Sequence, residues 1–269
     1  MKNFPLKGKT VFITGASSGI GKACAETFAS HGSNVVITAR RLGRLKDLAG
    51  KLEQEGVKVF PFELDVQKNE QVEAVFETLK NEKIEIDVLI NNAGLAVTSD
   101  KIQDGKAVNW DRMIDTNIKG LLYVTRAVLS SMTQRNQGHI INIGSVAGRF
   151  CYTGGNIYCA TKFAVKSICQ SLRVDLFGTA IRVSEIAPGA VETEFSEVRW
   201  NDKEKAKQLY QGFTPLTAED IADAVLYCAT RPMHVNVSEI VIYPQAQASI
   251  TEIYRPGKEP VKNLFSSGK

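Results

Sequence analysis

The sequence predicts a doubly wound α/β fold in which helices cover both faces of a seven-stranded parallel sheet. Short runs rich in β-branched residues alternate with longer amphipathic stretches along most of the chain. This alternation is the pattern of parallel strands joined by crossover helices. The composition does not change along the chain and no repeat is visible, so we expect one three-layer domain over residues 1–269.

The predicted strands are "TVFIT" (10–14), "NVVITA" (34–39), "KVFPFEL" (58–64), "DVLIN" (87–91), "HIINIG" (139–144), "RVSEIA" (182–187) and "EIVIY" (239–243). The predicted helices cover roughly residues 19–30, 41–55, 68–81, 109–134, 157–177 and 217–230. Two segments do not fit the alternation. A charged insertion at 189–216 follows the carboxyl end of a strand, where a substrate lid is expected. The Pro/Gly/Lys-rich segment 246–269 predicts an irregular tail that either crosses onto a neighbouring subunit or is partly disordered.

Bulk composition argues against several classes of function. The 269 residues carry a net charge of only +4, with no dense basic block, so we expect no nucleic-acid partner. No run of 18 apolar residues and no secretory leader are visible, which predicts a cytoplasmic protein without membrane contact. Five cysteines without a CxxC pair and three scattered histidines predict reduced thiols and no metal site.

The segment "TGASSGIG" (14–21) lies between the first predicted strand and the first helix. Its glycines Gly15, Gly19 and Gly21 allow a tight turn and a close approach of the backbone to a pyrophosphate at a helix N-terminus. Glycine also serves ordinary turns, but the position after strand one makes the segment a strong signal for a Rossmann-type dinucleotide site. We expect the loop residues Ser17, Ser18 and Ile20 to share in this binding.

The end of the second strand predicts which dinucleotide binds. NAD sites usually have an acidic residue there, whereas this chain has Ala39 followed by Arg40 and Arg41, with no acid from residue 27 to 46. A guanidinium group suits a 2′-phosphate, which favours NADP(H) over NAD(H); the alternative is that both arginines simply begin a helix. Asp65, beside Val66 at the end of the third strand, is placed to accept from the adenine amino group or to cap a helix.

Tyr158 and Lys162 lie four residues apart in "GGNIYCATKFA" (154–164) and therefore share one helix face. An ordinary tyrosine titrates near pH 10, and a neighbouring ammonium group would lower that pKa into the working range of a base. Such a pair alone is more often a surface contact, so its meaning depends on the other motifs.

With these residues in place, the chain resembles the short-chain dehydrogenase/reductase family from residue 8 to about 245. The resemblance is carried by "TGASSGIG", "NNAG" (91–94), Asn117, Ser145, "YCATK" (158–162) and "PGAVET" (188–193). "GGNIYCATKFAV", "EKAKQLYQGFTPLTAEDIADAV" and "IVIYPQAQAS" further resemble its NADP-dependent 3-hydroxy acid dehydrogenases, which include the serine/allo-threonine dehydrogenase group. Such a match implies hydride transfer between NADP(H) and the hydroxyl or carbonyl carbon of a small 3-hydroxy acid or related alcohol.

The family resemblance also implies roles for individual residues. Tyr158 would be the general acid and base, Ser145 would bind the reacting oxygen, Lys162 would also hold the nicotinamide ribose, and Asn117 would hold a relay water. Asn92, Ala93 and Gly94 would line the adenosine ribose, and Pro188, Gly189, Val191 and Thr193 would face the nicotinamide, whereas Asn91 ties neighbouring strands. Relatives usually form homotetramers through the long helices, here 109–134 and 157–177, and the last strand.

The substrate is the least determined part of the prediction. We expect its carboxylate to contact Asn156 or backbone amides near 146–148. A reductase of another carbonyl, such as a β-ketoacyl ester, a steroid or a xenobiotic ketone, is the main alternative, although the "DGG"-type ending of acyl-carrier enzymes is replaced by "IYPQAQ". A non-catalytic NADP-binding regulator is a further alternative, disfavoured because Asn117, Ser145, Tyr158 and Lys162 are all present.

Overall fold

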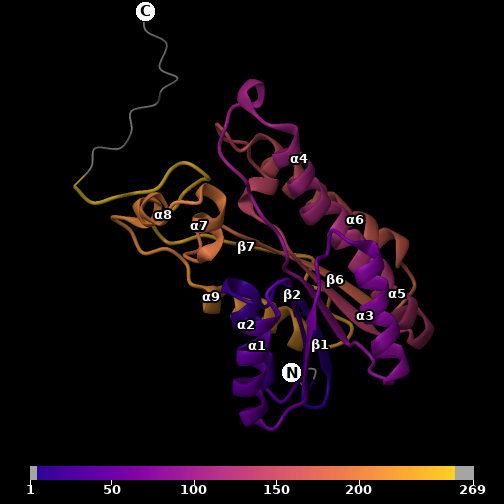
Figure 1. Cartoon of the computed structure of the whole chain (residues 1–269). Coiled ribbons are helices and arrows are strands. Elements are labelled where there is room, and N and C mark those ends of the chain that lie inside the picture. The colour runs from indigo at the N-terminus through magenta and orange to yellow at the C-terminus, as the bar shows by residue number, and fades with distance from the viewer. Residues whose placement is uncertain (1–4, 258–269) are drawn as a thin grey trace, which may run out of the picture.

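Seven parallel strands form the central sheet of the computed structural model, which describes residues 5–257 (Figure 1). The strands are β1 (Thr10–Thr14), β2 (Asn34–Ala39), β3 (Val59–Glu63), β4 (Val88–Asn91), β5 (Gly138–Ile143), β6 (Ile181–Pro188) and β7 (Glu239–Ile242). Their order in space is β3-β2-β1-β4-β5-β6-β7, with every neighbouring pair parallel. The order reverses between β1 and β4, and sheets of this kind bind ligands at the carboxyl ends of the strands at such a reversal.

Helices cover both faces of the sheet. One face carries α1 (Gly19–Ser30), α2 (Leu42–Leu52) and α9 (Ala218–Thr230), and the other carries α3 (Asn69–Asn81), α5 (Leu121–Arg135) and α6 (Asn156–Asp175) (Figure 1). Val11 and Ile13 of β1 pack on the first face, while Phe12 packs on the second and stacks on Phe76 with ring centroids 5.0 Å apart. Because β1 is buried on both faces, its sequence is a continuous apolar run.

The predicted fold class is confirmed, and each strand end lies within one residue of its predicted position. The single helix predicted over 109–134 is wrong in detail. It consists of α4 (Ala107–Ile114), a π-helical turn η3 (Asp115–Gly120) and α5. Gly120 in this turn packs so closely on Val66 that a Cβ there would lie 2.7 Å from a Val66 methyl group. Such π-turns are frequent at functional sites.

The insertion at 189–216 contains two helices that the sequence pattern did not predict, α7 (Glu194–Trp200) and α8 (Lys203–Tyr210). Thr193 caps α7 by accepting from the Phe195 N–H at 3.3 Å, and Asn201 ends it in the left-handed conformation at φ +50°. Both helices are too short and too charged to give a clear apolar period.

The first part of the predicted irregular tail packs beside α8. The Arg255 guanidinium donates from Nη2 to the Leu209 carbonyl at 2.9 Å and from Nε to the Gln211 carbonyl at 3.0 Å. Residues 246–257 contain turns and an isolated bridge between Gln247 and Ile253. The rest of the predicted tail, 258–269, lies outside the described residues.

Residues 5–257 lack the features of a membrane span and of a metal site. None of the helices in this range is both long enough and apolar enough to cross a membrane. The same range contains no group of three or more His, Cys, Asp or Glu side chains arranged to hold a metal ion.

Candidate active site

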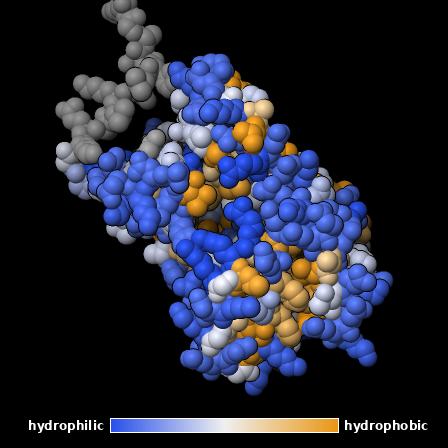
Figure 2. Space-filling view, viewed as in Figure 1, coloured by the Kyte–Doolittle hydropathy of each residue, from blue (hydrophilic) through white to orange (hydrophobic). Residues whose placement is uncertain are grey.

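A cleft of about 630 Å³ opens at the carboxyl ends of the strands, beside α7 and α8. Figure 2 shows it as a hollow with both hydrophilic and hydrophobic side chains around it. Its volume lies in the range of ligand and cofactor sites. Most predicted site residues line it: Gly15, Ser17, Ser18, Gly19, Ile20, Arg40, Arg41, Asp65, Val66, Asn92, Ala93, Gly94, Ser145, Tyr158, Lys162, Pro188, Gly189, Val191 and Thr193. Gly21, Asn117 and Asn156 lie outside this lining.

The glycine loop has the geometry of an anion site. Gly15 and Gly19 adopt left-handed conformations with φ +69° and +53°, which favour glycine. A Cβ at Gly21 would lie 2.5 Å from the Gly15 carbonyl oxygen, so this glycine allows α1 to pack against the loop. The Ser18 side chain makes no capping bond at the start of α1. The N–H groups of the first turn of α1 have no partner within the helix. Together with the glycine loop they form a site that fits a pyrophosphate.

Arginines gather beside this loop, where β2 ends. Arg41 donates from Nε and Nη2 to the Ser17 hydroxyl at 3.2 and 2.9 Å, and from Nη2 to the Ser18 hydroxyl at 2.9 Å. Arg40 also lines the cleft. The cluster provides the positive charge and the donors that a 2′-phosphate requires.

Asp65 lines the cleft after β3, and its carboxylate accepts from the Gln67 N–H at 3.1 Å. The N-cap residue of α3 is Lys68, so Asp65 caps the turn before this helix and the alternative role as its N-cap is wrong.

The "NNAG" segment holds the strands and the glycine loop together. Asn91 donates to the Asn142 side chain at 2.9 Å, which confirms that it ties β4 to β5. Asn92 donates from its side chain to the Thr14 and Gly15 carbonyls at 2.9 and 3.2 Å. The Asn92 amide therefore fixes the glycine loop while the residue lines the cleft.

The predicted catalytic side chains converge from three elements. Tyr158 and Lys162 lie on α6, with Lys162 Nζ 5.9 Å from the centre of the Tyr158 ring. Ser145 follows β5, and its hydroxyl lies near enough to the Tyr158 phenol to lower the pKa of this group. Asn117 is buried in η3, where its amide donates to the Leu95 carbonyl at 2.9 Å. Ser145, Tyr158 and Lys162 thus share the cleft, and Asn117 lies behind them.

Burial dominates the acidity of the Tyr158–Lys162 pair. It raises the pKa of Tyr158 well above the ordinary tyrosine value, although the Ser145 hydroxyl lowers it. Burial lowers the pKa of Lys162 to about 8, against the opposing effect of the Glu185 carboxylate. Lys162 Nζ donates to the Ile143 carbonyl at 2.8 Å. The predicted lowering of the Tyr158 pKa by Lys162 is not met: burial has the largest effect and raises this pKa, and the groups that lower it are Ser145 and Arg199. Tyr158 therefore holds its proton at neutral pH.

The segment after β6 forms the other wall of the cleft. Gly189 N donates to the Ile242 carbonyl at 2.7 Å, and the Val191 carbonyl accepts from the Tyr210 hydroxyl at 2.7 Å. A Cβ at Gly19 would lie 3.2 Å from the Thr193 Cβ. Thr193 therefore contacts the glycine loop directly, and its contact with a nicotinamide amide or a pyrophosphate stays a prediction.

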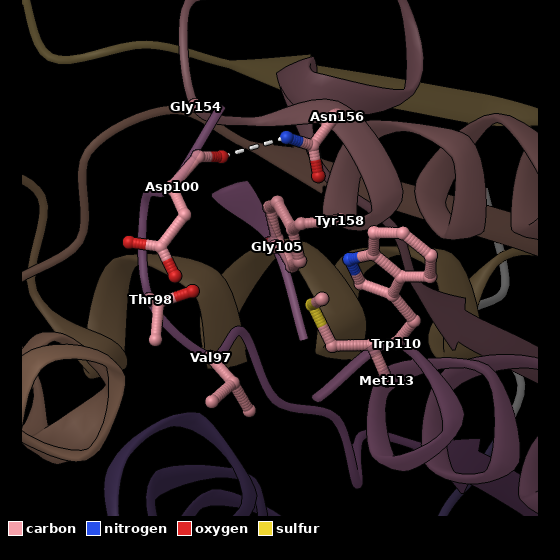
Figure 3. A pocket seen from close by; sticks show the side chains of 9 residues that line it. All are labelled: Val97, Thr98, Asp100, Gly105, Trp110, Met113, Gly154, Asn156 and Tyr158. Atoms are coloured by element: carbon pink, nitrogen blue, oxygen red, sulfur yellow. Dashed lines mark hydrogen bonds between the residues drawn. The ribbon is translucent and has the colours of Figure 1, made fainter. Parts of the chain in front are cut away.

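Asn156 lies in a small separate pocket beside Tyr158, with a volume of about 10 Å³ (Figure 3). Its Nδ2 donates to the Asp100 carbonyl at 2.8 Å, and its Oδ1 accepts from the Ile157 N–H at 2.6 Å. Both ends of this amide are thus engaged by the backbone, and its substrate contact stays a prediction.

The backbone amides proposed as the alternative contact, at 146–148, are also largely engaged. Ala147 N donates to the Ser145 hydroxyl at 3.1 Å and Gly148 N to the Ser145 carbonyl at 2.9 Å. Their bonds hold the turn that presents Ser145 to the cleft.

Two residues of α7 reach Tyr158 and were missed in the sequence. The Phe195 and Tyr158 rings lie 5.8 Å apart between centroids, and the Arg199 Cζ lies 5.9 Å from the centre of the Tyr158 ring. Arg199 Nη1 donates to the Tyr152 hydroxyl at 2.9 Å and Nε to the Thr98 carbonyl at 3.2 Å. Phe195 and Arg199 are four residues apart and therefore share one helix face. This spacing is the only feature of the sequence that indicates their common position.

Arg149 faces away from the substrate side. Its guanidinium pairs with Glu185 at 3.1 Å and Glu239 at 2.9 Å, and Nη1 also donates to the Ser145 carbonyl at 3.1 Å. Glu185 is almost completely buried. These ion pairs lie outside the cleft lining. Through Arg149 they hold the backbone at Ser145.

Fold and site together define a dinucleotide-binding α/β protein with a Ser–Tyr–Lys group in its cleft, and comparison with known proteins gives its family. The short chain dehydrogenase family model matches residues 9–204, and the chain belongs to this family. It is 43% identical over 253 residues to the NADP-dependent 3-hydroxy acid dehydrogenase of Schizosaccharomyces pombe, covering 93% of this chain and 98% of the relative. It is 46% identical to the NADP-dependent 3-hydroxy acid dehydrogenase YdfG of Salmonella typhi, covering 88% and 96%.

A solved structure of serine dehydrogenase in its closed form, complexed with NADP+, is 44% identical and superimposes with a TM-score of 0.86. The match covers 89% of this chain and 96% of that structure. The predicted family is thus confirmed, and the chain is similar to relatives of the predicted group.

Proposed function

We propose that the protein is an NADP-dependent oxidoreductase that transfers a hydride between NADP(H) and the hydroxyl or carbonyl carbon of small 3-hydroxy acids. The names of its relatives support this function. The glycine loop, the arginines after β2 and the 630 Å³ cleft fit a phosphorylated dinucleotide. When bound, the nicotinamide ring supplies or accepts the hydride.

The chain itself supplies the proton chemistry. In reduction, the Tyr158 phenol donates its proton to the substrate carbonyl oxygen, and its raised pKa keeps that proton in place at neutral pH. The Ser145 hydroxyl donates a hydrogen bond to the same oxygen and stabilises the negative charge that develops there. In oxidation, Tyr158 has to ionise before it accepts the hydroxyl proton, so alkaline pH favours this direction.

Lys162 and Asn117 take supporting roles. Lys162, with a pKa near 8, exchanges protons in the physiological range and is placed to hold the nicotinamide ribose. Asn117 makes two hydrogen bonds with the Leu95 backbone: its Nδ2 donates to the Leu95 carbonyl, and its Oδ1 accepts from the Leu95 N–H. We assign it to positioning the proton path between Lys162 and solvent.

One observation carries the specificity for an acid: Arg199 places a guanidinium beside the reacting phenol. Arg199 lines the cleft and forms no ion pair with any of residues 5–257. Its known partners are neutral oxygens of Tyr152 and Thr98. A substrate carboxylate would satisfy this charge, and a guanidinium–carboxylate contact orients the substrate as well as binding it. Uncharged ketones gain nothing from it, which favours an acid over the alternative carbonyl substrates.

The larger organisation follows from the same geometry. We infer one domain over residues 1–269, in which 189–216 is a lid because α7 brings Phe195 and Arg199 onto Tyr158.

A homotetramer is supported by apolar side chains exposed on and after α6, including Val174 at 74% and Phe177 at 91%. Light scattering tests this state, and a monomer would contradict it. The five free thiols fit the cytoplasm.

Replacement of Arg199 by Gln tests the specificity. A charge-assisted hydrogen bond contributes about 1.5–3 kcal/mol, so kcat/KM for a 3-hydroxy acid should fall roughly 10- to 100-fold, mostly through KM. The value for an uncharged alcohol of matched length should not change. Arg126→Gln, on an exposed pair with Glu73, is the matched control. Equal losses for the acid and the alcohol would contradict the assignment.

A further inference from the structure

Two ion pairs tie the lid helix α7 to the start of α2. Glu194, the first residue of α7, lies 3.0 Å from Arg41 and 2.8 Å from Arg44, measured between Oε and Nη1 atoms. Arg41 precedes α2 and Arg44 lies in its first turn. The contact therefore joins parts of the chain about 150 residues apart.

This contact lies at the edge of the lining of the dinucleotide cleft. Ser17, Arg41, Glu194 and Phe195 all belong to this lining, and Thr193 beside Glu194 packs on Gly19 of the glycine loop. Arg41 is held by the hydroxyls of Ser17 and Ser18 while it pairs with Glu194. The glycine loop, the arginine and the lid helix thus form one connected chain of contacts over the cleft.

The same helix reaches the reacting end of the site. Thr193 caps α7, and Phe195 and Arg199 on this helix lie against Tyr158. These contacts lie within one helix of seven residues. Holding its first residue over the glycine loop therefore also holds its aromatic and guanidinium groups over the substrate side.

We propose that Glu194 is a positioning residue that acts as a clasp: its ion pairs to Arg41 and Arg44 close α7 over the bound dinucleotide and slow the release of this cofactor. The inference rests on the proposed function, because the dinucleotide is what the clasp retains. It assigns Glu194 an effect on release from the cleft and not on the choice between NADPH and NADH.

The opposite effect, in which Glu194 competes with a 2′-phosphate for Arg41, fits the geometry less well. Arg44 makes the shorter contact with Glu194, and it lies outside the cleft lining. Arg40 lines the cleft and has no ion pair with any of residues 5–257. An anion in the cleft can therefore use Arg40 and Arg41 while Glu194 keeps Arg44.

The expected effect is modest, because Glu194, Arg41 and Arg44 keep 39–50% of their side-chain surface exposed. Pairs of this kind contribute little individually and are screened by salt. We expect loss of the clasp to accelerate dinucleotide release about two- to tenfold at low ionic strength, and to have a smaller effect in about 0.5 M salt.

Stopped-flow measurement of NADPH and NADH release from the whole protein, followed by energy transfer from tryptophan, tests the clasp. Trp200 lies on α7 itself and lines the cleft. Glu194→Gln and Arg44→Gln should each accelerate release of both dinucleotides, and the double variant should be no faster than Glu194→Gln alone, which already removes both ion pairs. Glu197→Gln, which changes the same charge on the same helix but not in the cleft lining, should release them at the wild-type rate. Circular dichroism confirms that each variant is folded.

Three results would overturn the clasp. Unchanged release in Glu194→Gln would remove its effect, slower release of NADPH alone would show competition for Arg41, and additive effects in the double variant would show that the residues act separately. In each of these cases the wild type still binds NADPH, so the proposed function stands. Failure of the wild-type protein to bind either dinucleotide would instead overturn the proposed function, and the clasp with it.

Discussion

Glu185 is a buried carboxylate that pairs with Arg149 next to the backbone of Ser145. Its replacement by Gln should strongly destabilise the fold. The side chain is 1% exposed and pairs with Arg149 through contacts of 3.1 and 3.2 Å. Arg149 is 9% exposed, and Nη1 also donates to the Ser145 carbonyl. Glutamine keeps the shape of the side chain but removes the negative charge that this guanidinium faces.

The magnitude follows from what remains around Arg149. Breaking a buried pair by removing one partner costs about 3–5 kcal/mol, because the other charge is left in a poorly solvated site. Arg149 keeps Glu239 at 2.9 Å, which places the expected loss at the lower end, about 3 kcal/mol. Since 1 kcal/mol corresponds to roughly 2–4 °C in Tm for a chain of this size, Tm should fall by roughly 6–12 °C.

Urea denaturation followed by circular dichroism measures the loss directly. Glu239→Gln should cost less, about 1 kcal/mol, because Glu239 is 33% exposed. Glu63→Gln, on the exposed end of β3, should change little. A Glu185→Gln variant as stable as Glu63→Gln would refute the reasoning, because the buried pair would then contribute nothing to the folded state.

Two further predictions concern the cofactor side and the pH dependence. Arg41→Gln should reduce the preference for NADP+ over NAD+ in kcat/KM by roughly 10- to 100-fold, since a charged hydrogen bond contributes about 1.5–3 kcal/mol; equal losses with both dinucleotides would contradict it. Burial lowers the pKa of Lys162 from 10.5 to about 8. The unfolded chain therefore binds more protons between these values, and this group's contribution to the free energy of unfolding rises with pH across the window. Lys162→Met should remove that rise, as measured by urea denaturation at about pH 7.5 and about pH 10; the same pH slope in both proteins would contradict the assignment.

The sequence predicted the parts of the fold that depend on local patterns. Five of the strands are short, largely buried runs, and the edge strands β3 and β7 are partly exposed but equally rich in apolar residues, so composition and length are sufficient to predict them. The glycine loop was predictable because Gly15 and Gly19 need backbone conformations that other residues rarely adopt. The predicted placement of Ser145 and Tyr158 in one cleft is also met by the structure, since their motifs follow elements of clear pattern.

The features that were missed depend on contacts between distant segments. Arg199 lies on a charged helix of seven residues, and nothing local shows that it faces Tyr158 across the cleft. The predicted acidity of Tyr158 rests on Lys162, whereas burial, which depends on how distant segments pack, raises this pKa. The π-helical turn at Asn117 is set by packing around Gly120, which a helical pattern does not record.

Initial rates of NADP+ reduction with L-serine, L-allo-threonine and 3-hydroxypropionate, in the wild type and in Tyr158→Phe, test the central claim most directly. We predict clear turnover of at least one of these acids by the wild type. In Tyr158→Phe the rate should fall roughly 10²- to 10⁴-fold, the usual contribution of a general acid or base, while the affinity for NADP+ changes little. A variant that keeps most of its rate, or a wild type that reduces NADP+ with none of these acids, would contradict the account.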